Sequence, residues 1–347
     1  MELAAAAFAG AGVSVAAAAC GSGLIAWAGP LDAPRPRGSH SRPTVTSGGL
    51  AIVVASALGL FVFAAASPEA RLDLGRAALA VAFAGSLGLL GAVDDLFDLG
   101  AKPKLLLQAV GSVGFAALVA RIDVLPLAPG AVLHLAPLIA ILGTGLWLVV
   151  LTNAVNFMDG ANGLAAGCVA IASAGLAAAG FASGQPAIGG AALTAAAAIV
   201  GFLPWNLPAR RLFQGDVGAL FCGFAIAALQ VLAATGEPGR TLSPYLAPFA
   251  MTPFLTDVLL TLASRARRGE RLFQAHRDHL YQVWLTRTGK SHGALAVRAW
   301  AVTATYTLAG LASEAAPRGW QAPLFAVGVA VCAAGWLAER RRLMRTG

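Results

Sequence analysis

The sequence predicts an all-α, polytopic membrane protein, a helical bundle of about 11 transmembrane helices. Of its 347 residues, 58% are hydrophobic and only 12% are charged, and the mean hydropathy is +0.75. A soluble domain of this length carries about 25% charged residues. The apolar residues also come in runs of about 18 or more, the length at which a helix crosses a bilayer. We therefore expect one transmembrane domain over residues 1–347.

In chain order, apolar runs between charged, proline or glycine breaks predict the individual spans. They lie near residues 3–29, 49–67, 76–93, 104–120, 133–152, 163–182, 187–206, 217–235, 243–264, 294–312 and 320–338. The first run carries Glu2 and no basic leader, so a span is expected rather than a cleaved signal peptide. The four cysteines lie in apolar stretches without metal-ligand spacing and are expected to be core residues.

The distribution of Lys and Arg predicts the orientation. One set of alternate loops holds 18 of the 24 basic residues and the other set holds 5. This bias places the N-terminus outside and the C-terminus in the cytoplasm, as an odd number of spans requires. The net charge of +8 therefore belongs to membrane loops and not to a nucleic-acid surface. The expected location is a bacterial inner membrane, in contact with its lipids.

Carboxylates, amides and basic residues gather on the predicted cytoplasmic side. The cytoplasmic loops near 30–48, 94–104, 153–163, 207–216 and 265–293 are expected to form the active site. The first of these loops is basic and proline-rich. Its basic residues either only reflect the orientation of the chain in the membrane or cover an anionic substrate. Outward loops hold scattered acids without such neighbours.

The third span ends in Asp94, Asp95 and Asp98, and Lys104 opens the next span. Adjacent carboxylates at a low-dielectric boundary are costly unless a cation neutralises them. Lys104 is close enough in the chain to do so. A solvated helix end is the alternative interpretation.

The segment 153–164 places Asn153, Asn156 and Asn162 around Asp159. These side chains offer hard oxygen ligands, which suit Mg²⁺. The alternative is that Asn and Gly simply form turns here.

Gly215 precedes Asp216 at a predicted helix start, where Asp216 is either a ligand or an N-cap. Phe213 is either an aromatic residue of the membrane interface or a platform for a base. In the longest cytoplasmic loop, His276 and His279 stand three apart, so a helix would place both on one face. Phosphate contact is favoured over zinc, because no third soft ligand follows. The alternative is a solvated basic loop against acidic lipids.

Hard-oxygen ligands, a lysine and a His/Arg loop at a membrane surface suit phosphoryl transfer to or from a lipid. These segments resemble the polyprenyl-phosphate N-acetylhexosamine-1-phosphate transferases (glycosyl transferase family 4, the family of MraY and WecA). The resemblance covers about residues 30 to 290 and rests on the order, spacing and sidedness of four motifs. The form His-Arg-Asp-His-Leu-Tyr-Gln at 276–282 looks most like the branch that initiates O-antigen and other surface polysaccharides.

The resemblance implies a Mg²⁺-dependent enzyme, with Mn²⁺ as an alternative ion. The enzyme would transfer N-acetylhexosamine 1-phosphate from a UDP-N-acetyl sugar to undecaprenyl phosphate, leaving UMP. Two departures from the family pattern stand out: Asn162 replaces a carboxylate, and Thr46 stands where Pro is common. Carried over by position, Asp94, Asp95, Asp159, His276 and His279 are expected to be catalytic; Lys104, Asn153, Asn162, Phe213 and Arg277 to bind substrate; and Asn156 and Asp216 to bind the metal.

Several alternatives stay open at this point. The chemistry is either direct attack by the lipid phosphate or a two-step route through an aspartyl-phosphate. A peptidoglycan phospho-N-acetylmuramoyl-pentapeptide transferase is the nearest functional rival. More distant rivals are a transporter with Asp257 as its coupling residue, a lipid-diphosphate phosphatase and an inactive scaffold. The sequence leaves open the identity of the sugar and the oligomeric state, with a homodimer as one option.

Overall fold

The computed structural model is almost entirely helical and describes residues 2–29, 31–32, 44–68, 71–237, 239–271 and 276–345. Most of the first predicted loop, near 30–48, therefore lies outside the described residues, and so do its basic residues Arg35, Arg37 and Arg42. The elements are α1 (Glu2–Ala28), β1 (Leu31–Asp32), β2 (Thr44–Val45), α2 (Gly49–Ala66), α3 (Arg71–Phe97), α4 (Ala101–Leu118), β3 (Val124–Ala128), β4 (Ala131–His134), α5 (Pro137–Met158), α6 (Leu164–Ala182), α7 (Pro186–Asn206), α8 (Gly215–Ala234), α9 (Leu246–Ala250), α10 (Thr252–Arg267), α11 (Leu280–Thr288), α12 (His292–Glu314) and α13 (Gln321–Arg345).

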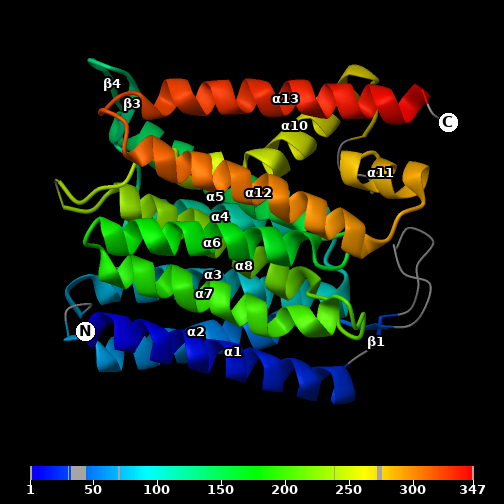
Figure 1. Cartoon of the computed structure of the whole chain (residues 1–347), viewed down its shortest axis with the longest axis horizontal. Helices are drawn as coiled ribbons and strands as arrows, with labels where there is room; N and C mark the ends of the chain where they lie inside the picture. The colour runs from blue at the N-terminus through cyan, green and yellow to red at the C-terminus, as the bar shows by residue number, and fades with distance from the viewer. Residues whose placement is uncertain are drawn as a thin grey trace.

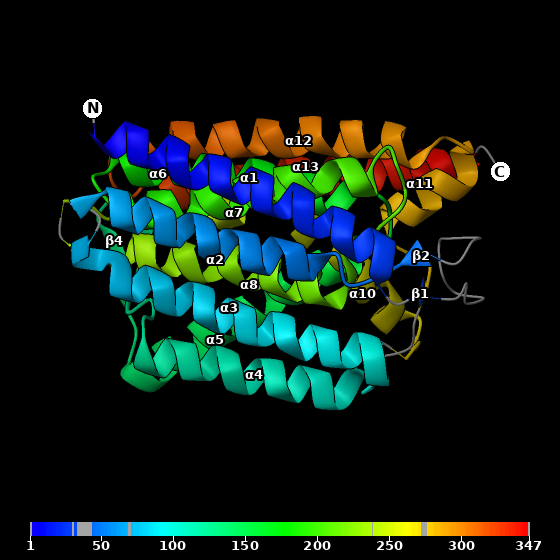
Figure 2. The ribbon, with the colours of Figure 1, turned by 90° about the horizontal axis from the view of Figure 1, so that it is seen from below.

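The long helices run side by side in one bundle (Figures 1 and 2). Within the described residues, eight helices are long and apolar enough to cross a membrane: α1, α2, α3, α5, α6, α7, α8 and α13. This confirms a polytopic all-α membrane protein. The remaining three predicted spans correspond to α4, to α9 with α10, and to α12, so the count of eleven stays a prediction. The two chain ends lie at opposite ends of the bundle (Figure 1), as an odd count requires.

Helix α8 is the centre of the bundle. Its most apolar window is 94% buried, and α2, α3, α5, α6 and α7 pack around it. Small residues allow this close packing, because they let helix backbones approach one another. Large apolar side chains instead point outward from peripheral helices: Phe8 is 79% exposed, Phe61 72% and Leu118 80%. Such a surface suits contact with lipid rather than water.

Two predicted spans differ from the observed elements. The span expected at 133–152 begins too early, because 124–134 form the antiparallel hairpin β3–β4 and α5 starts only at Pro137. Gly130 turns this hairpin with φ +76°, a left-handed conformation that ends any helix. The span expected at 243–264 is split at Met251 between α9 and α10. Pro253 lies in the first turn of α10, where a proline starts a helix but cannot continue one.

Candidate active site

The ends of α3, α4 and α8 bring two carboxylates to one lysine. Lys104 Nζ lies 2.7 Å from Asp94 Oδ2 and 2.5 Å from Asp216 Oδ2, and none of the three side chains is more than a quarter exposed. Asp94 Oδ1 also accepts the N–H of Leu99 at 3.0 Å, which fixes the turn after α3. A cation shared by two poorly hydrated carboxylates offsets their mutual repulsion. Lys104 thus lies beside Asp94, as its place in the sequence predicted, and Asp216 joins them from 112 positions away.

The approach of α3 to α8 depends on glycine. A Cβ at Gly91 would overlap the backbone of Asp216, so a larger residue would push the two helices apart. The Asp216 N–H donates to Asp95 Oδ1 at 3.3 Å. Gly215 adopts φ +68°, and a Cβ there would lie 2.6 Å from Asp95 Oδ2. Asp95 is therefore held against the start of α8. The N-cap of α8 is Gln214, and the Asp216 carboxylate instead accepts from Lys104 and Asn156.

The C-terminal turn of α5 carries two asparagines with different roles. Asn156 Nδ2 donates to Asp216 Oδ1 at 2.9 Å. Asn153, three residues earlier, donates instead to Gln108 Oε1 at 2.5 Å and to the Val149 carbonyl at 2.8 Å. Asn153 therefore ties α5 to α4. The structure does not bring it to the cavity where a substrate contact was predicted.

Asp159 follows the last residue of α5. Removal of its carboxyl from bulk water, and then the negative charges of Asp216 and Asp95, raise the pKa of Asp159 well above its usual range. In the absence of a cation this carboxyl therefore holds its proton more tightly than an ordinary Asp does.

Asn206, at the end of α7, joins two loops of the site. Its Oδ1 accepts the Gly163 N–H at 2.5 Å, and its Nδ2 donates to the Leu212 carbonyl at 3.0 Å. The side chain is only 5% exposed. Asn206 was not predicted as a site residue. The available signal was a polar residue at the end of an apolar span, two residues before Pro208.

A short backbone pairing joins the chain before α2 to the chain before α8. The Phe213 N–H donates to the Val45 carbonyl at 2.9 Å, and the Gly48 N–H donates to the Phe213 carbonyl at 2.9 Å. This pairing brings Thr46 and Phe213 to the same cavity. Thr46, the departure from the family pattern in the first loop, is thus a neighbour of the other site residues.

A cavity of about 630 Å³ lies where these segments meet. Small-molecule sites commonly measure ~300–1,000 Å³. Seven of the twelve predicted site residues line it: Asp95, Asn156, Asp159, Asn162, Phe213, Asp216 and Arg277. The other five do not line it: Asp94, Lys104, Asn153, His276 and His279. Among the lining residues that were not predicted is His292, whose Nδ1 accepts the Asn162 N–H at 3.2 Å.

The segment 276–279 is irregular chain and not a helix. α11 begins only at Leu280, and His279 is its N-cap. The helix that would have placed both histidines on one face is therefore not formed, although their rings lie close, with centroids 4.9 Å apart. His279 is 3% exposed and stacks on Phe157 with ring centroids 5.9 Å apart, so it is an interior residue. Arg277, between the histidines, lines the cavity.

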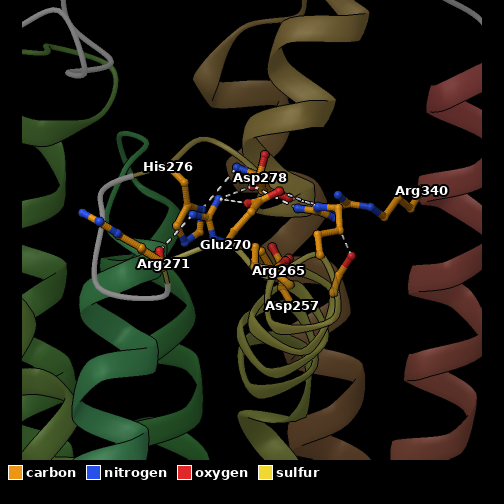
Figure 3. A network of polar contacts seen from close by, with 10 residues as sticks. Asp257, Arg265, Glu270, Arg271, His276, Asp278 and Arg340 are labelled. Carbon is orange, nitrogen blue, oxygen red and sulfur yellow. Dashed lines mark hydrogen bonds and ion pairs between the residues drawn. The ribbon is translucent and has the colours of Figure 1, made fainter.

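Arg265 of α10 contacts this irregular segment through Asp278 (Figure 3). The Arg265 guanidinium lies 2.5 Å from Asp278 Oδ2 and 2.8 Å from Glu270 Oε2, and it donates to the Arg271 carbonyl at 3.1 Å. Burial alone would raise the pKa of Asp278, but the hydrogen bond and charge of Arg265 hold this pKa below its usual value. Burial, and then nearby positive charge, lowers the pKa of His276, which favours its neutral form at pH 7.

The lining residues fit a Mg²⁺ ion bound together with a phosphorylated ligand. Asp95, Asn156, Asp159 and Asp216 present carboxylate and amide oxygens to one cavity, a donor set that Mg²⁺ prefers. Asp95 Oδ2 is buried without a hydrogen-bond partner among the described residues, so an acceptor oxygen remains for a cation or a ligand group. In the part of the chain that the structure describes, no three Asp, Glu, His or Cys side chains form a metal-binding group by themselves. Mg²⁺ commonly takes one or two carboxylates and completes its shell with phosphate oxygens and water.

Comparison with known proteins gives a consistent result. Residues 77–234 match the family described as glycosyl transferase family 4. This match includes the carboxylates, Lys104 and the 153–163 loop, but it ends before the histidine segment.

Curated relatives cover more of the chain. The undecaprenyl-phosphate alpha-N-acetylglucosaminyl 1-phosphate transferase of Thermotoga maritima is 29% identical over 75% of this chain and 74% of its own length. The decaprenyl-phosphate N-acetylglucosaminephosphotransferase of Mycobacterium leprae is 30% identical over 75% of this chain and 70% of its own. The phospho-N-acetylmuramoyl-pentapeptide-transferase of Mycobacterium marinum is 30% identical over 78% of this chain and 84% of its own.

Proposed function

Because the chain belongs to glycosyl transferase family 4, we propose that it transfers N-acetylhexosamine 1-phosphate from a UDP-sugar to undecaprenyl phosphate. The products would be undecaprenyl-diphospho-N-acetylhexosamine and UMP, in the first membrane step of a surface polysaccharide. The observation that carries this proposal is the Asp94–Lys104–Asp216 arrangement beside a cavity that also holds Asn156 and Arg277. Lys104 offsets the charge of the two carboxylates, so that Arg277 can contact a diphosphate while carboxylate and amide oxygens remain as ligands for a divalent ion.

The proposed location is the bacterial inner membrane, with the cavity open to the cytoplasm. The excess of Lys and Arg in the loops at the cavity end supports this orientation. A nucleotide sugar would then arrive from the cytosol and the lipid phosphate from the bilayer.

In the proposed reaction, an oxygen of the lipid phosphate attacks the phosphorus that carries the sugar. The bond from that phosphorus to the bridging oxygen breaks, and UMP leaves with the oxygen. A phosphate monoester has a second pKa of about 6, so the acceptor is already largely dianionic at pH 7. It therefore needs orientation more than deprotonation. Asp95 would orient it or take a residual proton, and Arg277 would neutralise the diphosphate.

Mg²⁺, or Mn²⁺ in its place, would be held by Asn156 and Asp216, and would supply charge neutralisation at the transferring phosphate. Removal of the ion with a chelator is expected to abolish UMP release, and added Mg²⁺ is expected to restore it. Full activity in the chelator would overturn the metal assignment.

The decisive assay incubates the purified protein with undecaprenyl phosphate, Mg²⁺ and a panel of UDP-N-acetyl sugars, and measures UMP. Release of UMP with one or more simple UDP-N-acetylhexosamines supports the proposal. Release only with UDP-N-acetylmuramoyl-pentapeptide would assign the peptidoglycan branch, and no UMP from any sugar would exclude the transferase.

Asp216→Ala is expected to abolish turnover, whereas Asp123→Ala is the matched control. Asp123 is half exposed at the opposite end of the bundle, in an ion pair with Arg121. An Asp216→Ala protein that is folded and fully active would refute a role for Asp216 in metal binding.

Direct attack is separated from the aspartyl-phosphate route by isotope exchange. In the two-step route, labelled UMP enters the UDP-sugar without any lipid acceptor. Such exchange in the purified protein would overturn direct attack.

A further inference from the structure

Asp257 is a buried carboxylate outside the cavity that the proposed function uses. It lies within α10 and is only 4% exposed. An ionised side chain in such a place is costly unless several donors satisfy it. A transporter would use it as a coupling residue, but its contacts indicate another role.

Asp257 caps a helix to which it does not belong. Asp257 Oδ1 accepts the Leu280 N–H at 2.8 Å, and Oδ2 accepts the Tyr281 N–H at 3.3 Å. These are the first two residues of α11, whose N–H groups have no partner within their own helix. The N-cap residue, His279, makes no side-chain cap bond to α11, and its Nδ1 instead lies 3.8 Å from Asp257 Oδ1. A negative charge at this end also complements the helix dipole.

The C-terminal helix α13 fixes the same junction from the other side. Trp336 Nε1 donates to Asp257 Oδ1 at 3.0 Å, and Arg340 Nη1 donates to the Asp278 carbonyl at 2.7 Å. The Arg340 guanidinium also lies 5.0 Å from the centre of the Trp336 ring. Figure 3 shows Asp257 beneath the segment that carries Asp278, with Arg340 reaching in from α13. The chain at 278–281 is therefore held by α10 and α13 together.

The position of α11 determines one wall of the cavity. Gln282, Leu285 and Thr286 of α11 line the cavity, and so does Arg277 just before the helix. The Tyr281 hydroxyl donates to the Phe157 carbonyl at 3.2 Å, which joins α11 to the last turn of α5. A shift at the start of α11 would therefore move several lining residues at once.

We propose that Asp257 is a positioning residue for the nucleotide-sugar side of the cavity, and that Trp336 and Arg340 of α13 hold it and the adjoining segment in place. The assignment to the nucleotide-sugar side rests on the proposed function. Asp257 touches no substrate; it acts through the placement of Arg277 and α11.

The test compares Asp257→Asn and Trp336→Phe with wild type in two measurements. Each oxygen of the Asp257 carboxylate accepts one backbone N–H group. Asparagine has only one acceptor oxygen, so its NH₂ group would face the other N–H group. Loss of one or two such bonds, each worth about 1 kcal/mol net, predicts a rise of roughly 5- to 30-fold in the KM for the UDP-sugar with Asp257→Asn. Trp336→Phe removes one bond and keeps the ring beneath Arg340, so a rise of about 5-fold is expected. The KM for undecaprenyl phosphate is expected to stay within twofold.

The second measurement is amide hydrogen exchange of peptides that cover 276–289. Exchange there is expected to become faster in both variants, whereas peptides from α6 and α8 keep their protection. Trp320→Phe and Arg341→Ala are the matched controls, because both residues are exposed. Neither control is expected to change the UDP-sugar KM or the exchange of α11.

A merely structural role predicts a different result. If the variants lowered only the amount of active protein, with both KM values unchanged, the positioning role would be wrong. Unchanged exchange in α11 would refute the capping itself. If wild type released no UMP, the proposed function would be wrong. Amide hydrogen exchange would still show whether Asp257 caps α11.

Discussion

Replacing Lys104 by methionine would leave two carboxylates facing each other without their shared cation. Lys104 Nζ lies within 2.7 Å of an oxygen of both Asp94 and Asp216. Methionine keeps the length of the side chain and removes its charge. Both the stability of the protein and its UMP release are expected to fall.

The magnitude follows from the burial of the three groups. At an effective dielectric constant of about 20, unit charges about 3 Å apart interact by roughly 5–6 kcal/mol, before the cost of desolvation. Removing one partner of a buried ion pair costs about 3–5 kcal/mol. The side chains are 13–25% exposed, so we expect the lower value, about 3 kcal/mol. Activity is expected to fall about 100-fold or more, the typical effect of losing a preorganised charge contact.

Cys168 and Cys222 are buried, as predicted, whereas Cys20 is exposed and not a core residue. Thermal unfolding can therefore be followed with a thiol-reactive dye in a Cys20→Ser background, because the buried thiols become accessible on unfolding. Lys102→Met is the matched control, since Lys102 is exposed on the same helix. Adding Asp94→Asn to Lys104→Met relieves the repulsion and is expected to restore about 1–2 kcal/mol of stability without restoring activity. Unchanged stability and activity in Lys104→Met, or strictly additive effects in the double variant, would refute the reasoning.

Three further predictions concern other parts of the site. Asn206→Ala leaves the Gly163 N–H and the Leu212 carbonyl buried and unpaired. The free energy of unfolding is therefore expected to fall by about 2 kcal/mol and the UDP-sugar KM to rise. Wild-type values for both would contradict the role of Asn206 in joining these two loops. Gly215→Ala places a methyl group against Asp95 and is expected to cost at least about 10-fold in UMP release, whereas Gly100→Ala, also at positive φ but with no neighbour within 4 Å, is expected to retain activity. If both variants behave alike, backbone strain alone is responsible. The raised pKa of Asp159 means that the folded state binds its proton more tightly than the unfolded state, so this carboxyl destabilises the fold increasingly as the pH rises. In chelator, Asp159→Asn is therefore expected to exceed wild type in melting temperature by more at pH 8 than at pH 5, and an equal difference at both would contradict the shift.

Hydropathy and charge were enough to predict the membrane bundle and the side on which polar groups gather. Both properties belong to contiguous segments, so no knowledge of packing is needed. Asp95, Asp159 and Asp216 were predicted at one end of the bundle, and they do line one cavity. Their order in the chain and their neighbours also carried the family resemblance.

Local backbone form was harder to predict where apolar runs continue through a break. The span predicted at 133–152 included Leu133 and His134, but these residues belong to β4 of a hairpin that turns at Gly130. The segment 276–279 has helical spacing of its histidines, yet Arg265 and Asp257 hold it and the start of α11 from α10. Contacts from distant residues override such local preferences.

By itself, the amino-acid sequence determined the fold class and the end of the bundle that carries the cavity, and it predicted seven of the residues that line this cavity. Only the tertiary structure decided between neighbours of the same type: Asn156 meets Asp216, whereas Asn153 meets Gln108 on α4. It also revealed Asn206 and Asp257 as the residues that join loops and helix ends. The physical reason is that each role depends on which helix faces which, and that choice arises from close packing between segments far apart in the chain.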